Sequence, residues 1–223
     1  EAIYNDEIDR ARRLIQSGKY NNDVYGSLNM LHLAAQRGQA EICGRLLDAG
    51  LSIRRKNEPE HGPGRTPLQF AIQSGSVDTA KLLLTRGAEL TPADSGTKNG
   101  SPHTPLVLLA INSGNPAMLQ FLIDQGRDAD DLGYLVNAIR AVHDPEKRMR
   151  FVELLLHAGV ELELQDGEWD PFAAAIYAGD LKLLRLLEDT LPFEYSEPHL
   201  RAAVMSNNVD ICRHVVSKGA RAT

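Results

Sequence analysis

Residues 64–87, GRTPLQFAIQSGSVDTAKLLLTRG, decide the fold of this chain. Thr66 can cap a helix, and Pro67 suits the first turn because a missing N–H costs nothing there. Apolar residues then recur at helical spacing as far as Gly75, and again from Val77 to Thr85. Gly87 can supply the left-handed end of the second helix. The stretch therefore predicts two short helices joined by a tight turn.

The ending of this stretch, two apolar residues, two variable residues and a glycine, recurs along the chain. Its glycines are Gly18, Gly50, Gly87, Gly126, Gly159 and Gly219. The first five are 32 to 39 residues apart, and a seventh copy from Leu186 to Thr190 lacks the glycine. A period in this range indicates stacked helical units and not one globular core.

The beginning of the stretch recurs as well, at residues 29–38, 104–114 and 170–179. The combination Thr-Pro-Leu-x-x-Ala, then Gly, then an apolar helix ending Leu-Leu-x-x-Gly resembles the ankyrin repeat. The resemblance implies an all-α repeat fold, a solenoid of paired antiparallel helices with projecting β-hairpin or loop fingers. It implies one domain over residues 1–223, with repeats at approximately 1–24, 25–62, 63–99, 100–130, 131–165, 166–194 and 195–223.

The composition of the chain argues against some classes of partner and indicates a cellular compartment. The chain has a net charge of −6 and a pI near 5.6, which argues against nucleic-acid binding. No apolar run approaches the roughly 20 residues that a membrane helix needs, so membrane insertion is not expected. Cys43 and Cys212 occupy matching helix positions in distant repeats. We expect both to be free thiols in a reducing compartment, the cytoplasm or the nucleus.

Motifs for catalysis are missing from the sequence. It holds no His-Glu-x-x-His or Cys-x-x-Cys pair, no phosphate loop and no Gly-x-Ser-x-Gly phrase. We therefore predict no metal, no cofactor and no enzymatic activity. The resemblance gives His32 a structural hydrogen-bonding role.

In ankyrin proteins, ligands lie on the concave side, against the fingers and the variable positions of the first helices. The resemblance carries this role to Gln36, Arg37, Arg65, Gln73, His103, Asn112, Arg140, Trp169, Tyr177 and Met205. Trp169, the only tryptophan, has the composition of a binding hot spot, or its ring packs flat on a neighbouring finger. Tyr177 belongs to the same repeat and could extend that aromatic patch.

The connecting segments differ in charge and length. Segment 51–65 holds four basic and two acidic residues, whereas segment 160–170 holds five acids and no base. Opposite charges on different connecting segments can steer a charged partner toward one end of the chain. Alternatively, the acids are present only because solvent-exposed loops tolerate them. Segment 88–103 is a long finger in which Thr91 and Ser101 could be phosphorylated. Residues 143–147 are expected to lengthen a turn between two helices.

These patterns favour a non-catalytic protein–protein interaction module, a scaffold or adaptor that binds a segment of a partner protein. The alternative is a regulatory ankyrin region of a larger enzyme or transport protein that acts intramolecularly. Neither end of the chain has the polar face of a capping repeat, which suggests a piece of a longer protein. We expect a monomer.

Overall fold

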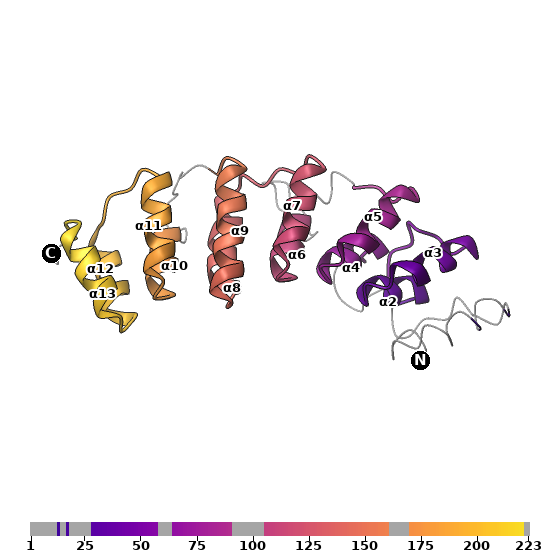
Figure 1. The fold of residues 1–223 in the computed structure, drawn as a ribbon, viewed down its shortest axis with the longest axis horizontal. Helices are drawn as coiled ribbons and strands as arrows, with labels where there is room; N and C mark the ends of the chain where they lie inside the picture. The colour runs from indigo at the N-terminus through magenta and orange to yellow at the C-terminus, as the bar shows by residue number, and fades with distance from the viewer. Residues whose placement is uncertain are drawn as a thin grey trace. The chain divides into compact units, whose positions relative to one another are not determined.

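The computed structural model describes Arg13, Ser17 and residues 28–57, 64–90, 105–160 and 170–220. Over these residues the chain consists of helix pairs and contains no strand (Figure 1). The helices are α2 (Met30–Gln36), α3 (Ala40–Asp48), α4 (Pro67–Gln73), α5 (Val77–Thr85), α6 (Leu106–Asn112), α7 (Pro116–Asp124), α8 (Leu132–Ala141), α9 (Pro145–His157), α10 (Pro171–Tyr177), α11 (Leu181–Thr190), α12 (Glu197–Met205) and α13 (Val209–Ser217). The even-numbered helix comes first in every pair, and the all-α repeat architecture is confirmed.

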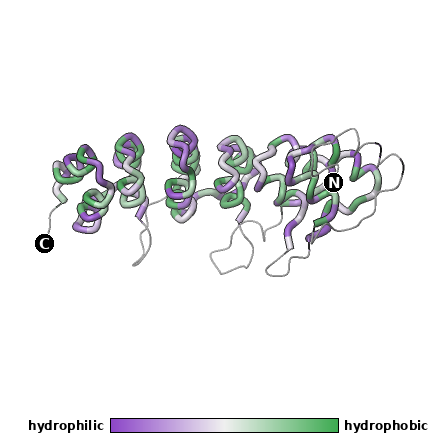
Figure 2. The backbone as a smooth tube through the Cα atoms, turned by 90° about the horizontal axis from the view of Figure 1, so that it is seen from below, coloured by the Kyte–Doolittle hydropathy of each residue, from purple (hydrophilic) through white to green (hydrophobic). Residues whose placement is uncertain are grey.

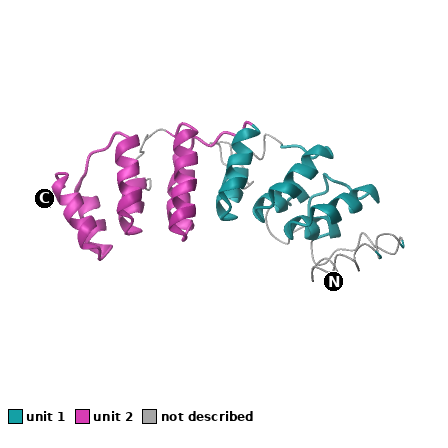
Figure 3. Cartoon of the chain, viewed as in Figure 1, with its two compact units in different colours: residues 1–125 teal, residues 126–223 magenta. Residues whose placement is uncertain are grey.

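The helices fall into two compact units, residues 1–125 and 126–223 (Figure 3). In the first unit, α4 packs between the first helices α2 and α6, and α5 packs between the second helices α3 and α7. In the second unit, α10 packs between α8 and α12. Each unit is therefore built by stacking one repeat on the next. The single seven-repeat domain stays a prediction.

Capping residues set where the first helices begin. The Thr66 hydroxyl accepts the N–H of Gln69 at 3.4 Å, while the Gln69 side chain accepts the N–H of Thr66 at 2.8 Å. Gly75 and Gly87 adopt φ values of 72° and 93° after α4 and α5. The predicted helix from Val77 to Thr85 is confirmed to the residue.

Apolar side chains hold each pair together and join it to its neighbours. Figure 2 shows hydrophobic and hydrophilic residues alternating along the helices, as expected when one side of each helix is buried. Fully buried side chains include Leu31, Ile42, Leu68, Leu83 and Met118 in the first unit and Phe151, Phe172, Leu183 and Ile211 in the second. The core is thus a series of interfaces between adjacent repeats.

Polar side chains in the turn between paired helices also tie one repeat to the preceding one. Asn115 Nδ2 donates to the carbonyl of Gly75 at 2.8 Å, and Asn208 Nδ2 donates to the carbonyl of Gly179 at 3.1 Å. Ser74 Oγ donates to the carbonyl of Ala35 at 3.3 Å. Such bonds satisfy carbonyls at helix ends and contribute about 1 kcal/mol each.

The insertion in the fifth repeat does not lengthen a turn, and that prediction was wrong. Residues from Pro145 onward belong to α9, which has 13 residues where the other second helices have nine or ten. Asp144 Oδ1 accepts the N–H groups of Glu146 and Lys147, both at 3.0 Å. Asp-Pro is a strong helix-start signal, so the added residues extend the helix.

Candidate protein-binding surface

The last turn of each first helix carries one exposed residue from the predicted binding set. These residues are Gln36, Gln73 and Asn112 in the first unit and Arg140, Tyr177 and Met205 in the second. First helices are neighbours within a unit, so equivalent positions lie side by side. We call the first three residues the amide row and the other three the mixed row. Their binding role stays a prediction.

The mixed row contains a direct contact between two predicted residues. The Tyr177 hydroxyl donates to the sulfur of Met205 at 3.3 Å, and the two side chains are 48% and 63% exposed. Large apolar side chains that remain this exposed mark surfaces for interaction when they cluster. Tyrosine and methionine combine a large apolar area with an adaptable shape. The pair can therefore receive an apolar side chain of a partner.

In the first unit, Arg65 is held against the amide row. Its Nη1 atom donates to Oε1 of Gln73 at 2.8 Å. Gln73 is the last residue of α4, so this bond holds the Arg65 guanidinium beside the C-terminal end of that helix. Arg37, which caps the end of α2, is exposed. Sequence reasoning identified both arginines but gave no sign of the bond to Gln73.

The segment that leads to Arg65 is fixed at its base; we call residues 52–57 together with Arg65 the basic finger. His32 Nε2 lies 2.9 Å from the carbonyl oxygen of Arg55. The N–H of Asn57 donates to the carbonyl of Arg65 at 3.0 Å, and the N–H of Arg65 donates to Oδ1 of Asn57 at 2.5 Å. Burial lowers the pKa of His32, so its neutral ring can serve as donor and acceptor at once. The predicted structural role of His32 is confirmed.

Gly64 makes the base of the basic finger possible, and its replacement gives a test. An added Cβ would lie 2.1 Å from the backbone oxygen of Asn57. We therefore expect Gly64→Ala to destabilise the chain by about 1–3 kcal/mol in urea denaturation. Gly44 in α3 is the control, because a Cβ there meets Leu82 at an ordinary 3.8 Å. Gly44→Ala should leave stability unchanged or raise it by up to about 1 kcal/mol. Equal effects of the two changes would contradict this account of the finger.

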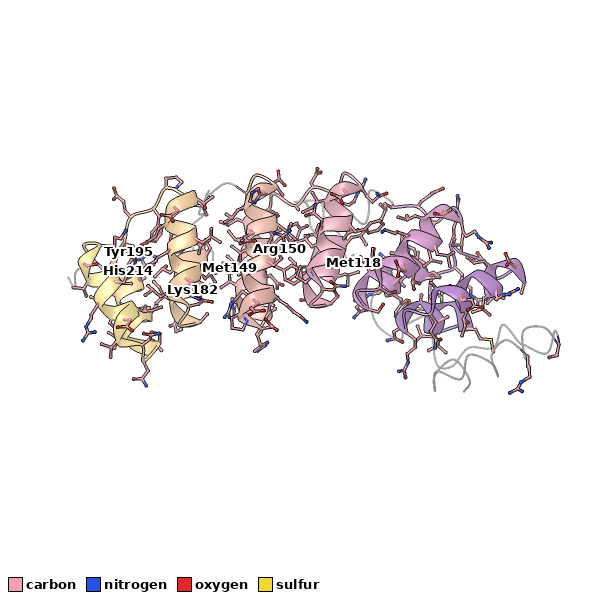
Figure 4. The ribbon with its side chains drawn as sticks, in the orientation of Figure 1. Met118, Met149, Arg150, Lys182, Tyr195 and His214 are labelled. Atoms are coloured by element: carbon pink, nitrogen blue, oxygen red, sulfur yellow. The ribbon has the colours of Figure 1, made fainter. Side chains whose placement is uncertain are left out.

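A cluster of polar side chains in the second unit was not predicted from the sequence (Figure 4). Glu188 on α11 accepts the hydroxyl of Tyr195 at 2.6 Å and Nε2 of His214 at 2.8 Å, and Lys218 Nζ lies 3.5 Å away. Burial opposes ionisation of Glu188, but the hydrogen bonds and the nearby charges of His214 and Lys218 outweigh it. The pKa of Glu188 is therefore lowered. The cluster attaches the last helix pair to α11.

A second carboxylate–histidine pair lies beside this cluster. The N–H of Ser196 donates to Nδ1 of His199 at 3.1 Å, so Nδ1 is an acceptor and Nε2 is the ring nitrogen that can donate. That Nε2 atom pairs with the carboxylate of Asp170, the capping residue of α10. The hydroxyl of Ser196 also lies 2.8 Å from Nδ1 of His199, in the capping box that begins α12. The imidazole groups of the last repeat are thus engaged in joining or capping helices.

Two members of the predicted set, His103 and Trp169, lie outside the described residues. The same holds for Thr91, Ser101 and most of segment 88–103. The hot-spot role of Trp169, its shared patch with Tyr177 and the phosphorylation of the long finger therefore stay predictions.

The described residues lack metal sites and membrane-spanning helices. They contain no group of three or more His, Cys, Asp or Glu side chains placed to hold a metal ion. Within the same residues, no helix has the length and apolar character needed to cross a bilayer. Cys43 and Cys212 are free thiols, as predicted, and burial raises the pKa of Cys43 to about 12.

Known proteins resemble this chain in sequence. The family profile described as ankyrin repeats (3 copies) matches residues 1–94. Ankyrin repeat protein nuc-2 of Neurospora crassa is 29% identical over 153 residues, which cover 68% of this chain and 13% of that protein. A Caenorhabditis elegans homolog of transient receptor potential cation channel subfamily A member 1 is 34% identical over 100 residues, 45% of this chain and 7% of the relative. The chain therefore spans a small part of these relatives.

A solved structure extends the likeness to most of the chain. The human ASB11 ankyrin repeat domain superposes with a TM-score of 0.67 at 22% sequence identity, covering 87% of this chain and 85% of that domain. At this identity the likeness establishes the fold alone. Together with the repeated sequence pattern and the stacked helix pairs, these matches identify ankyrin repeats over residues 1–94 and the ankyrin repeat fold over most of the chain.

Proposed function

We propose that this protein is a non-catalytic interaction module, a scaffold or adaptor that binds a segment of another protein. Ankyrin repeats generally mediate protein–protein interaction, which gives the class of function. The proposed binding surfaces use the positions that the family resemblance assigns to ligand contact, namely the amide row and the basic finger in the first unit and the mixed row in the second. The observation that carries it is the exposed contact between Tyr177 and Met205.

The composition of this contact supports an anchor for a partner. Interface energy concentrates in a few aromatic or large apolar residues that a partner shields from water. The other phenylalanine and tyrosine rings of the first helices, those of Phe70, Tyr134 and Phe172, are buried. Tyr177 and Met205 leave apolar area in water on adjacent helices, and burying it under a partner is favourable by about 25 cal/mol per Å².

A regulatory region acting within a larger protein is the second candidate. It is supported by the likeness to a cation channel homolog, of which the matched part is a small fraction. In that case the segment bound by the rows belongs to the same polypeptide. The full-length reading frame, followed by binding of the isolated ankyrin region to the remainder, separates the two candidates.

The proposal also covers the cellular compartment and the oligomeric state of the protein. The free thiols of Cys43 and Cys212 support a reducing compartment, the cytoplasm or the nucleus. We further propose a monomer that needs no cofactor and turns over no substrate. The ankyrin fold is typically a non-catalytic module, and the net charge of −6 disfavours nucleic acid as the general partner.

The proposal predicts a selective loss of binding when the exposed pair is removed. The double variant Tyr177→Ala, Met205→Ala should bind a captured partner more weakly than wild type by about 1–3 kcal/mol, because both anchors lose their apolar area. Thermal unfolding should change little, since both side chains are exposed. The measurement is affinity capture from a lysate with quantitative mass spectrometry, then titration of each retained protein.

The control for this experiment is Lys182→Ala with Arg185→Ala, two exposed residues on the second helix α11. Proteins kept by wild type and by the control but lost with the Tyr177/Met205 variant support the mixed row. An equal loss with both variants, or a lower unfolding temperature of the Tyr177/Met205 variant alone, would show that the pair does not act as a binding anchor.

A further inference from the structure

We infer that the first unit recognises an acidic, extended segment of its partner, held between the basic finger and the amide row. The inference rests on the proposed function, because it names the chemical class of partner for the proposed binding surface of the first unit. It depends on three observations, namely where the charges lie, how the finger is fixed and what the amide row offers.

Charges in the first unit are sorted between its two layers. The first helices α2, α4 and α6 contain no charged residue. The acids described in this unit are Glu41, Asp48, Asp78 and Asp124 on second helices, and Glu89 in a finger. The bases beside the first helices and in the fingers are Arg37, Arg54, Arg55, Lys56 and Arg65. The side that would contact a partner is therefore mainly positive.

One of these bases already has an acidic partner. Arg54 pairs with Glu89 of the following finger, and both side chains are well exposed. Arg55 and Lys56 are exposed as well, and no carboxylate of the described residues forms an ion pair with either of them. Counting Glu58 and Glu60, which lie outside the described residues, segment 51–65 keeps two more bases than acids. A positive field on a projecting segment attracts a negatively charged partner.

The backbone at the base of the basic finger and the guanidinium of Arg65 are fixed before any partner binds. His32 holds the carbonyl of Arg55, and Asn57 makes two hydrogen bonds with the backbone of Arg65. The Arg65 guanidinium is further held by Gln73 at 2.8 Å. A guanidinium that is already oriented loses less conformational entropy when it binds a carboxylate. Arg65 is thus placed to contact a carboxylate and the amide row together.

The amide row suits an extended backbone. Each carboxamide of Gln36, Gln73 and Asn112 can donate and accept, which matches the N–H and C=O groups of a peptide. Packed helices lie about 8–10 Å apart, and an extended chain advances about 3.3 Å per residue. A segment that crosses the first helices therefore meets one carboxamide about every third residue. The row binds backbone, while the finger selects the acidic side chains.

Nucleic acid is the rival ligand for a positive surface. Single-stranded nucleic acid gains much of its binding energy by stacking bases on aromatic side chains. Neither the amide row nor the basic finger contains an aromatic residue, and the rings of Phe70 and His32 in the first helices are buried. The carboxamides and the overall charge of −6 favour a protein segment.

The test selects a displayed library of random 16-residue peptides on the full chain. We expect enriched peptides to be acidic and to bind less tightly as salt is raised. The double variant Arg55→Glu, Lys56→Glu should bind these peptides about tenfold more weakly, or weaker still. The matched control, Arg45→Glu with Lys81→Glu, makes the same charge change on exposed residues of α3 and α5 and should alter binding less than about twofold.

Each other result overturns the inference. An acidic partner would be rejected if neutral or basic peptides were enriched, or if no peptide were enriched. It would also be rejected if the control variant lost as much peptide binding as the Arg55/Lys56 variant. Tighter binding of a mixed-sequence 20-nucleotide RNA than of the best peptide would assign the surface to nucleic acid. If acidic selection fails while the Tyr177/Met205 variant still loses a captured protein, the interaction module stands. If both fail, the proposed function falls as well.

Discussion

Replacing Phe172 by alanine is expected to destabilise the second unit by about 3–5 kcal/mol. Phe172 is fully buried in α10, and its ring stacks on Phe193 at a centroid distance of 3.6 Å and an angle of 6°. Phe193 in turn meets Tyr195 and His199 edge-on. Removal of the Phe172 ring leaves a cavity where the sixth and seventh repeats join, and repeats depend on that interface for stability.

Urea denaturation followed by circular dichroism measures this loss. Phe193→Leu is the control, because Phe193 is half-buried and leucine keeps most of its apolar contact. We expect that variant to lose less than half as much free energy of unfolding as Phe172→Ala. A loss below about 1 kcal/mol for Phe172→Ala would contradict the packing described here.

Glu188→Ala is expected to cost about 2–4 kcal/mol, the second largest effect. The carboxylate is 12% exposed and receives hydrogen bonds from Tyr195 and His214. Its removal leaves these two groups without their acceptor inside a partly buried site. Tyr195→Phe removes one donor alone and should cost about 1 kcal/mol. Equal costs for the two variants would mean that Glu188 interacts with Tyr195 alone.

The pH dependence of this effect follows from the lowered pKa of Glu188. A carboxyl group whose pKa is lower in the folded chain stabilises it above the unfolded pKa, about 4.3 for glutamate. That contribution is lost as pH falls through the folded pKa. The stability difference between wild type and Glu188→Ala should therefore be full near pH 6 and shrink below about pH 4. A difference that grows on acidification would contradict the ion pairing of Glu188.

Local signals explain why much of the fold could be predicted. Thr66 and Pro67 begin a helix and Gly87 ends the next one through interactions within a few residues, so those bounds were predictable. Asp144 and Pro145 carry the same kind of start signal. The sequence analysis places these residues in a turn, so it does not predict the extension of α9. The length of a repeat alone does not predict whether inserted residues lengthen a helix or a turn.

The candidate surface was predictable where it depends on register. Tyr177 and Met205 occupy the same position in successive repeats, and equivalent positions of stacked repeats are neighbours. The bond from Arg65 to Gln73 and the attachment of Tyr195 and His214 to Glu188 depend on side-chain directions and on residues far apart in the chain. No periodic pattern encodes such pairs, so sequence reasoning could not find them.

The measurement that tests the central claim most directly is site-specific photo-crosslinking in a lysate. A benzophenone amino acid replaces Tyr177 in one variant and Lys182 in another, so that two exposed positions on a first and a second helix are compared. The proposed interaction module predicts that position 177 crosslinks to a discrete protein, that unlabelled wild-type chain competes this away, and that position 182 does not crosslink to it. Equal crosslinking at both positions, or none at 177 while the chain still captures partners, would contradict it.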